Sequence, residues 1–124
     1  MQIKDVINFL EAQVPRSMQE SYDNCGVQVG NVHAEVTGAI VSLDCTEDVV
    51  QEAIDKKCNL IIAHHPVVFK GVKSLTGKNY VERTLLKAIK NDICIYAIHT
   101  NLDNYRFGVN KKIGEKLGLE KLQI

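Results

Sequence analysis

Two short apolar runs constrain the fold of this chain more than any other feature. Residues 60–63 (Leu-Ile-Ile-Ala) and 93–98 (Ile-Cys-Ile-Tyr-Ala-Ile) show no polar alternation and are too short for ordinary helices. A strand with this pattern has both faces covered, as in a parallel sheet between helices. The chain is therefore predicted to contain a sheet with a helical layer on each side.

Segments with helical spacing separate these runs. Apolar residues recur at steps of three and four in four segments, 3–14, 47–57, 79–91 and 109–117. In the third helix we expect Leu85 and Ile89 to face the core and Glu82 to face solvent. Two further strands are predicted, one over residues 36–43 and a short edge strand at 27–29.

This alternation of strands and helices favours parallel strands joined by right-handed crossovers. The predicted fold class is α/β, a three-layer α/β/α arrangement with a mainly parallel sheet. A length of 124 residues suits a single domain spanning residues 1–124.

Metal-binding residue types follow the predicted strands. His64 and His65 come directly after one apolar run, His99 and Asp103 follow the other, and Asp44 follows the strand within 36–43. Because the carboxyl ends of parallel strands meet at one edge of a sheet, we expect these side chains to lie close together. The predicted metal ligands are His64, His65 and Asp103, with Asp44 and His99 as further ligands or as hydrogen-bond partners that orient the ligands.

The chemistry of this set favours hydrolysis. Consecutive side chains on a regular strand point to opposite faces, so His64 and His65 are expected to bind different ions, with Asp103 placed to bridge them. Two such ions lower the pKa of a bridging water and polarise the atom that it attacks. Imidazole and carboxylate ligands suit zinc, iron, manganese or nickel, and ligand type alone does not choose among them.

Simpler structural roles compete with chemistry at several positions. An Asp before a helix often caps it, which is the alternative for Asp44. His33 is isolated and is expected to be structural, and the lysines around Gly71 and Gly77 lack the spacing of a phosphate-binding loop. The four cysteines form no Cys-x-x-Cys pair and are expected to be reduced thiols, with Cys25 and Cys45 acting as small buried residues.

Charge and hydropathy exclude other classes of protein. Fifteen basic and fifteen acidic residues give a formal net charge of zero, which argues against a general nucleic-acid or anionic-membrane surface. No apolar run approaches the roughly 20 residues of a membrane span, and residues 1–5 lack the features of a signal peptide. A cytoplasmic location is therefore expected.

Four stretches together resemble a known family. Residues 22–30, 43–46, 61–69 and 99–103 are similar to the Nif-three-like dinuclear metal-centre proteins, also called GTP cyclohydrolase I type 2 homologues, and the resemblance runs from about residue 3 to 118. It implies a duplicated α/β/α architecture, a toroidal hexamer and two divalent metal ions per site. It also implies that His64 and His65 each bind a different metal and that Asp103 is a shared or first-metal carboxylate.

The chain departs from the family pattern in two respects. Tyr22 stands where the family often has Trp. Family members are also longer, and their second half supplies a His-x-x-x-Glu pair that this chain lacks after Asp103. The chain thus resembles the N-terminal half of a family protein, with three of the usual five ligands, and water or a neighbouring chain would fill the open positions.

Two functions of different classes remain open from the sequence. The first is a divalent-metal-dependent hydrolase of the GTP-cyclohydrolase kind that acts on a nucleotide-like substrate. The second is a metal-binding scaffold, regulatory or metal-trafficking protein, which stays open because no substrate motif is recognisable. A third expectation is that a half-length chain has no activity of its own.

Overall fold

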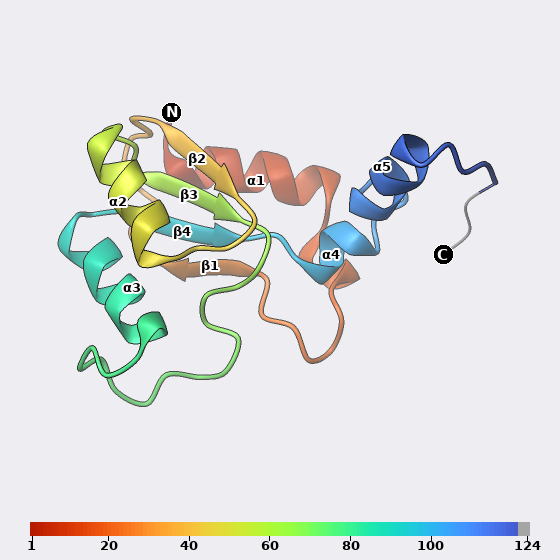
Figure 1. Cartoon of the computed structure of the whole chain (residues 1–124). Helices are drawn as coiled ribbons and strands as arrows, with labels where there is room; N and C mark the ends of the chain where they lie inside the picture. Colours follow the sequence, from red (N-terminus) through yellow and green to blue (C-terminus); the bar gives the residue numbers. More distant parts are fainter. Residues whose placement is uncertain (122–124) are drawn as a thin grey trace.

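A four-stranded sheet forms the centre of the computed structural model, which describes residues 1–121 (Figure 1). The strand order is β1-β4-β3-β2, and β2, β3 and β4 are parallel while β1 runs antiparallel to β4. The strands are β1 (Gly26–Val29), β2 (Ala39–Ser42), β3 (Leu60–Ala63) and β4 (Cys94–Ala97). The mainly parallel sheet is therefore confirmed.

Helices cover both faces of the sheet and confirm the three-layer α/β/α class. One face packs against α1, and the other packs against α2 and α3 (Figure 1). The helices are α1 (Ile3–Gln13), the 3-10 turn η1 (Arg16–Met18), α2 (Glu47–Asp55), α3 (Tyr80–Lys90), α4 (Thr100–Asp103) and α5 (Val109–Lys116). Within residues 1–121, no helix combines the length and apolar character needed to cross a membrane.

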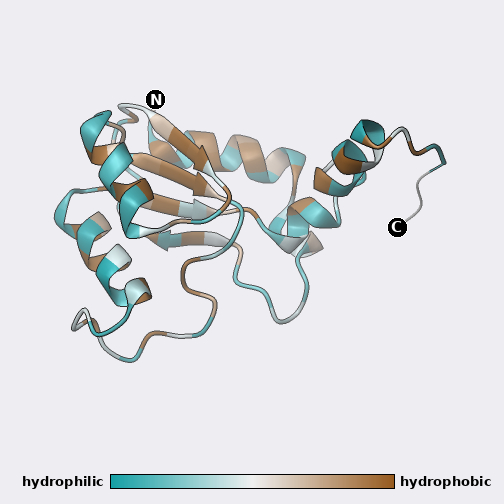
Figure 2. Cartoon of the chain, in the orientation of Figure 1, coloured by the Kyte–Doolittle hydropathy of each residue, from teal (hydrophilic) through white to brown (hydrophobic). Residues whose placement is uncertain are grey.

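The two central strands supply the core, as their uninterrupted apolar character predicts (Figure 2). Alternate residues of β3 and β4 point to opposite faces. Ile61 and Ile95 pack with α2 and α3, whereas Leu60 and Tyr96 pack with α1. Every residue of β4 is buried. Full burial of one such apolar side chain stabilises the fold by about 1.5–3 kcal/mol, so β3 and β4 anchor the sheet.

Some predicted details were wrong. In α3, Ile89 was expected to face the core but is 45% exposed, while Glu82 was expected to face solvent but is 3% exposed. The helix predicted over 109–117 forms, yet Ile113 and Leu117 on its apolar stripe are exposed, because α5 lies beyond the sheet and packs against α4 (Figure 1). The predicted strand within 36–43 is shortened to the four residues of β2.

The buried carboxylate of Glu82 has a specific local role. Its Oε2 accepts hydrogen bonds from the backbone N–H groups of Thr76 (2.9 Å), Gly77 (3.0 Å) and Lys78 (3.3 Å), and Oε1 accepts one from the Asn79 side chain (2.9 Å). Asn79 in turn caps α3 by accepting from the Glu82 N–H (2.9 Å). These bonds satisfy a buried charge and fix the loop that enters α3.

The acid stability of the protein is expected to depend on Glu82. Hydrogen bonds, above all from the Thr76 backbone, lower the pKa of Glu82 to about 2 from its ordinary value of 4.5. A depressed pKa stabilises the fold above pH 4.5, and this contribution is lost as the pH falls toward 2. In Glu82→Gln, a side-chain NH2 group, which donates hydrogen bonds, would have to sit among the N–H donors that now bind the carboxylate. We therefore expect a melting temperature several degrees lower at neutral pH.

Thermal melts between pH 2 and 7 check this expectation. Wild-type protein should lose stability between pH 4.5 and 2 more steeply than Glu82→Gln. Glu52→Gln is the matched control, because Glu52 is an exposed residue of α2 whose carboxylate lies 2.8 Å from the Lys56 ammonium. Equal melting temperatures for Glu82→Gln and wild type at pH 7 would contradict the assigned role.

Candidate metal centre

The register of the sheet brings four chain segments to one edge. Ala63 at the end of β3 pairs with Ser42 at the end of β2 and with Ala97 at the end of β4. Gly26 at the start of antiparallel β1 also pairs with Ala97. The residues that follow β2, β3 and β4 and those that precede β1 therefore meet at the carboxyl edge of the parallel strands.

His64 is fixed by the neighbouring strand. The Ile98 N–H donates to the Ala63 carbonyl (2.9 Å), and the His64 ring Nδ1 lies 2.9 Å from the Ile98 carbonyl oxygen. Because a carbonyl only accepts hydrogen bonds, Nδ1 carries the proton and donates. Nε2 is left with a lone pair that can bind a metal ion.

His65 is oriented by Asp44. The His65 N–H donates to the Leu43 carbonyl (2.9 Å), which places the ring beside Asp44, and Nδ1 lies 2.8 Å from Asp44 Oδ1. Asp44 is not the helix cap, because Thr46 occupies the N-cap position of α2 and accepts from the Val49 N–H (3.4 Å). A carboxylate on Nδ1 is a common way to hold a metal-binding imidazole, again leaving Nε2 available.

His99 is held by a residue that the sequence prediction missed. Its Nδ1 lies 2.9 Å from Oδ1 of Asp23, whose side chain is fully buried (0% exposed). Oδ2 of the same carboxylate accepts from the Thr100 N–H (3.0 Å), the Thr100 hydroxyl and the Cys25 thiol (3.0 Å). Asp23 is placed here because β1 runs antiparallel, so that the residues before it reach the site.

The charge on Asp23 is stabilised by its neighbours. Burial alone would raise the pKa of this carboxyl, but hydrogen bonds from Cys25, Thr100 and His99 outweigh burial and lower the pKa well below its usual range. Burial raises the pKa of the Cys25 thiol, and the adjacent Asp23 raises it further. The thiol therefore stays protonated and serves as a hydrogen-bond donor.

Three imidazoles converge at this edge. One ring nitrogen each from His64, His65 and His99 lies within 4.8 Å of the other two, and the ring centroids are 5.0–5.3 Å apart. Two nitrogens bound to one ion lie about 3–4 Å apart at usual metal–nitrogen bond lengths. A mutual approach of about 1 Å, within reach of small side-chain rotations, therefore fits the three rings around an ion.

Asp103 lies close to one of these rings. It is the last residue of α4, and its Oδ1 is 3.6 Å from Nε2 of His64. The short helix α4 turns the chain after β4, so Asp103 returns to the site four residues after His99, with its N–H bonded to the His99 carbonyl (3.1 Å). The carboxylate can thus join His64 in binding an ion.

The structure tests where the predicted site residues lie, but not which of them bind metal ions. His64, His65, His99, Asp44 and Asp103 all lie at one edge, as the strand order predicts. The argument that His64 and His65 point apart does not hold, because β3 ends at Ala63 and the two rings lie 5.0 Å apart. Binding of a different ion by each ring stays a prediction. Two sequence signals mark Asp23, its place in the family-like stretch 22–30 and its position just before an edge strand, but neither assigned it a role.

The fold and this edge define an α/β protein with a histidine-rich candidate metal centre. The family model described as Duf34/NIF3 (NGG1p interacting factor 3) matches residues 1–124. The chain therefore belongs to the Duf34/NIF3 family, in agreement with the resemblance seen in its motifs.

Named relatives and a solved structure support this assignment. A "GTP cyclohydrolase 1 type 2 homolog" of Clostridium acetobutylicum is 40% identical over 124 residues, covering the whole chain and 46% of the relative. A Staphylococcus aureus protein of the same name is 45% identical, and the chain covers 34% of it. The crystal structure of a Bacillus cereus protein related to NIF3 superposes with a TM-score of 0.94 at 37% identity, covering all of this chain and 34% of the other. The chain thus spans less than half the length of these relatives.

The tautomers of the three histidines provide a direct check of the site. In the metal-free protein, the neutral form of His64, His65 and His99 should carry its proton on Nδ1, because each Nδ1 faces an acceptor. Long-range proton–nitrogen NMR correlations report the tautomer of each ring. His33, an exposed residue, serves as the reference. Protonation on Nε2 in any of the three would contradict the described geometry.

Proposed function

We propose that this chain carries the metal centre of a divalent-metal-dependent hydrolase that acts on a nucleotide-like substrate. The observation that carries the proposal is the convergence of three imidazoles whose Nδ1 atoms are all bound to protein acceptors. Such an arrangement leaves Nε2 of each ring available, which is how proteins commonly prepare histidines to bind metal.

The donor set favours a transition metal or zinc over magnesium or calcium. Imidazole nitrogen suits zinc, iron, manganese and nickel, whereas magnesium and calcium prefer oxygen ligands. His64, His65 and Asp103 would hold the ions, with Asp44 and the Ile98 carbonyl orienting two of the rings. Two bound divalent ions, the number that the motif resemblance implies, would bring the pKa of water toward neutrality and polarise the group under attack.

The chain's own residues would contribute orientation and electrostatics. The hydrogen bonds to Nδ1 fix each imidazole before any ligand arrives, which reduces the reorganisation needed on binding. The buried, ionised Asp23, the exposed Asp44 and the partly exposed Asp103 add negative charge around the site. This charge favours cation binding, and the bound cations would in turn attract an anionic substrate.

The substrate class is inferred from the names of the relatives. Relatives at 40–45% identity are named GTP cyclohydrolase 1 type 2 homologs, which favours a nucleotide-like substrate. Assembly into a homo-oligomer, a hexamer by the motif resemblance, is part of the same proposal. Further ligands would then come from sequence corresponding to the remaining length of the relatives or from a neighbouring chain.

Substitution of His65 separates the enzyme from a non-enzymatic metal scaffold. With zinc, manganese or iron supplied, we expect hydrolysis of nucleoside triphosphates by the wild type and a loss of at least 100-fold in His65→Ala, because the ring supplies a ligand that no other residue replaces. The His33→Ala variant should keep wild-type activity. Product formation is followed by chromatography, and folding and assembly by circular dichroism and light scattering.

Two outcomes would contradict the hydrolase proposal. One is the absence of turnover in wild-type protein that retains its metal, and the other is a collapse of assembly in His65→Ala without any change in turnover. Either result would favour the metal-binding scaffold.

A further inference from the structure

We propose that a groove between β1, α3 and the loop of residues 66–79 binds a small molecule with an apolar body and one carboxylate, of the class of a medium-chain fatty acid. The groove has a volume of about 430 Å³, within the range of small-molecule sites in proteins. None of the described residues that line it is a candidate metal ligand, so the inference goes beyond the proposed hydrolase and does not depend on it.

The walls of the groove are apolar side chains from three segments. Leu85 of α3 is buried, whereas Ile89, one turn further along the helix, and Val72 of the loop are 45% and 37% exposed. Val29 of β1 and Val68 of the loop, both partly buried, complete the apolar lining. Ile89 was expected to face the core because it shares a helix face with Leu85, and it is exposed because it lines this open groove. A ligand that covers these side chains removes apolar surface from water.

The rim of the groove is positively charged. Residues 66–79 contain three lysines and no acidic residue. Lys78 pairs with the buried Glu82 (3.6 Å), whereas Lys73, the charged residue among the described ones that line the groove, forms no ion pair within residues 1–121. Ser74 lies on the same rim and offers a hydroxyl donor. One ammonium with one hydroxyl matches a singly charged carboxylate.

The outer edge of β1 favours a small molecule over an added peptide strand. Gln28 Nε2 donates to the carbonyl groups of Asn24 (2.8 Å) and Gly26 (3.1 Å), and Gln28 Oε1 accepts from the Val68 N–H (3.1 Å). These bonds attach the loop to the edge strand, and Figure 1 shows the loop running past β1 on its way to α3. A peptide that paired with β1 would have to displace them. A small molecule in the groove leaves them in place.

An NMR titration of the nitrogen-15-labelled full chain with sodium octanoate tests the proposal, with EDTA present so that the carboxylate cannot bind a metal ion. We expect saturable amide shifts confined to the groove, at Val29, residues 72–75 and Ile89. Octanoate should bind about five to ten times more tightly than hexanoate, because two further CH2 groups are partly buried. It should also bind about threefold more tightly than 1-octanol, which has an apolar body of the same length and no charge.

Two variants separate the charged rim from the apolar walls. Lys73→Glu reverses the charge at the rim, so it should weaken octanoate binding by about tenfold and leave octanol binding unchanged. Ile89→Glu places a carboxylate in the apolar wall and should weaken the binding of both molecules. Lys4→Glu is the matched control, because it makes the same charge change at an exposed position of α1, on the other face of the sheet, and it should match wild type.

Three results would overturn the proposal. The first is the absence of saturable shifts at the groove in wild-type protein, and the second is equal affinity for octanoate and octanol with no effect of Lys73→Glu. The third is a set of shifts centred on α5, whose exposed Ile113 and Leu117 offer another apolar surface. Circular dichroism establishes that each variant is folded. Should Ile89→Glu not fold, Lys73→Glu decides, because Lys73 is an exposed residue of a loop.

Discussion

The parallel pairing of β3 with β4 is the constraint on which the site depends. Ala63 and Ala97 are partners in the register, so the residues after each strand begin side by side. The Ile98 carbonyl can then bind His64, and His99 can reach the same edge. Because these strands are the most deeply buried elements of the fold, the apolar packing that stabilises the protein also sets the positions of its imidazoles.

A different element supplies the hydrogen-bond acceptor for each ring, and the three acceptor groups differ in how deeply they are buried. A backbone carbonyl holds His64, an exposed carboxylate after β2 holds His65, and a fully buried carboxylate before β1 holds His99. The exposed Asp44 is screened by water and contributes orientation more than stability. The buried Asp23 carboxylate accepts from five hydrogen-bond donors, so its position is fixed more firmly than that of the exposed Asp44.

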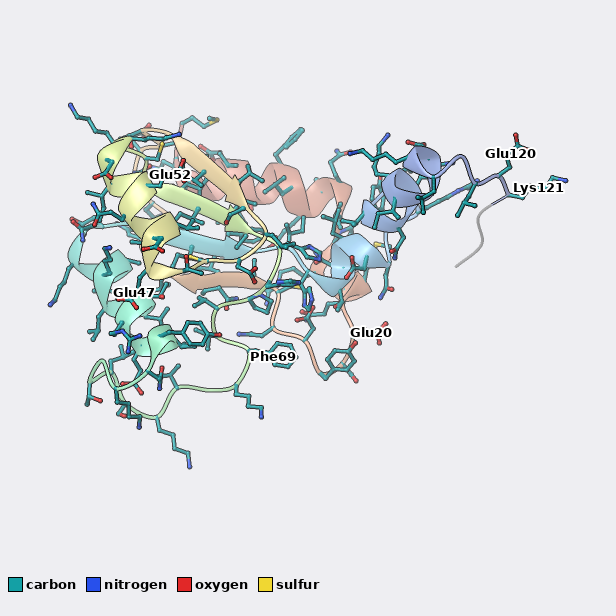
Figure 3. The ribbon with its side chains drawn as sticks, in the orientation of Figure 1. Glu20, Glu47, Glu52, Phe69, Glu120 and Lys121 are labelled. Atoms are coloured by element: carbon teal, nitrogen blue, oxygen red, sulfur yellow. The ribbon has the colours of Figure 1, made fainter. Side chains whose placement is uncertain are left out.

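The aromatic residues near this edge belong to the same loops. Tyr22 precedes Asp23, and its ring lies 6.5 Å from that of Phe69, on the loop that follows β3. Figure 3 shows Phe69 pointing toward the loop before β1. The Asn24 side chain donates to the Val68 carbonyl (2.6 Å) and joins the two loops, so the surroundings of the metal centre are built from contacts between distant parts of the sequence.

Sequence patterns predicted the sheet layers and the edge at which the site lies, because uninterrupted apolar runs report burial on two faces. They did not reveal Asp23, since its role depends on the antiparallel direction of β1, which local residues do not encode. Glu82 was misplaced because a carboxylate becomes buried only when a loop folds around it, and helical periodicity carries no information about that loop. The family follows from the motifs, whereas the metal and its ligands remain predictions.

Anomalous X-ray diffraction from crystals grown with zinc tests the central claim most directly, because it locates the ion without reference to activity. The account predicts an anomalous peak within bonding distance, about 2.0–2.1 Å, of imidazole Nε2 atoms at the carboxyl edge of β3 and β4. A crystal with no peak there, while the three rings keep the arrangement described, would contradict the account.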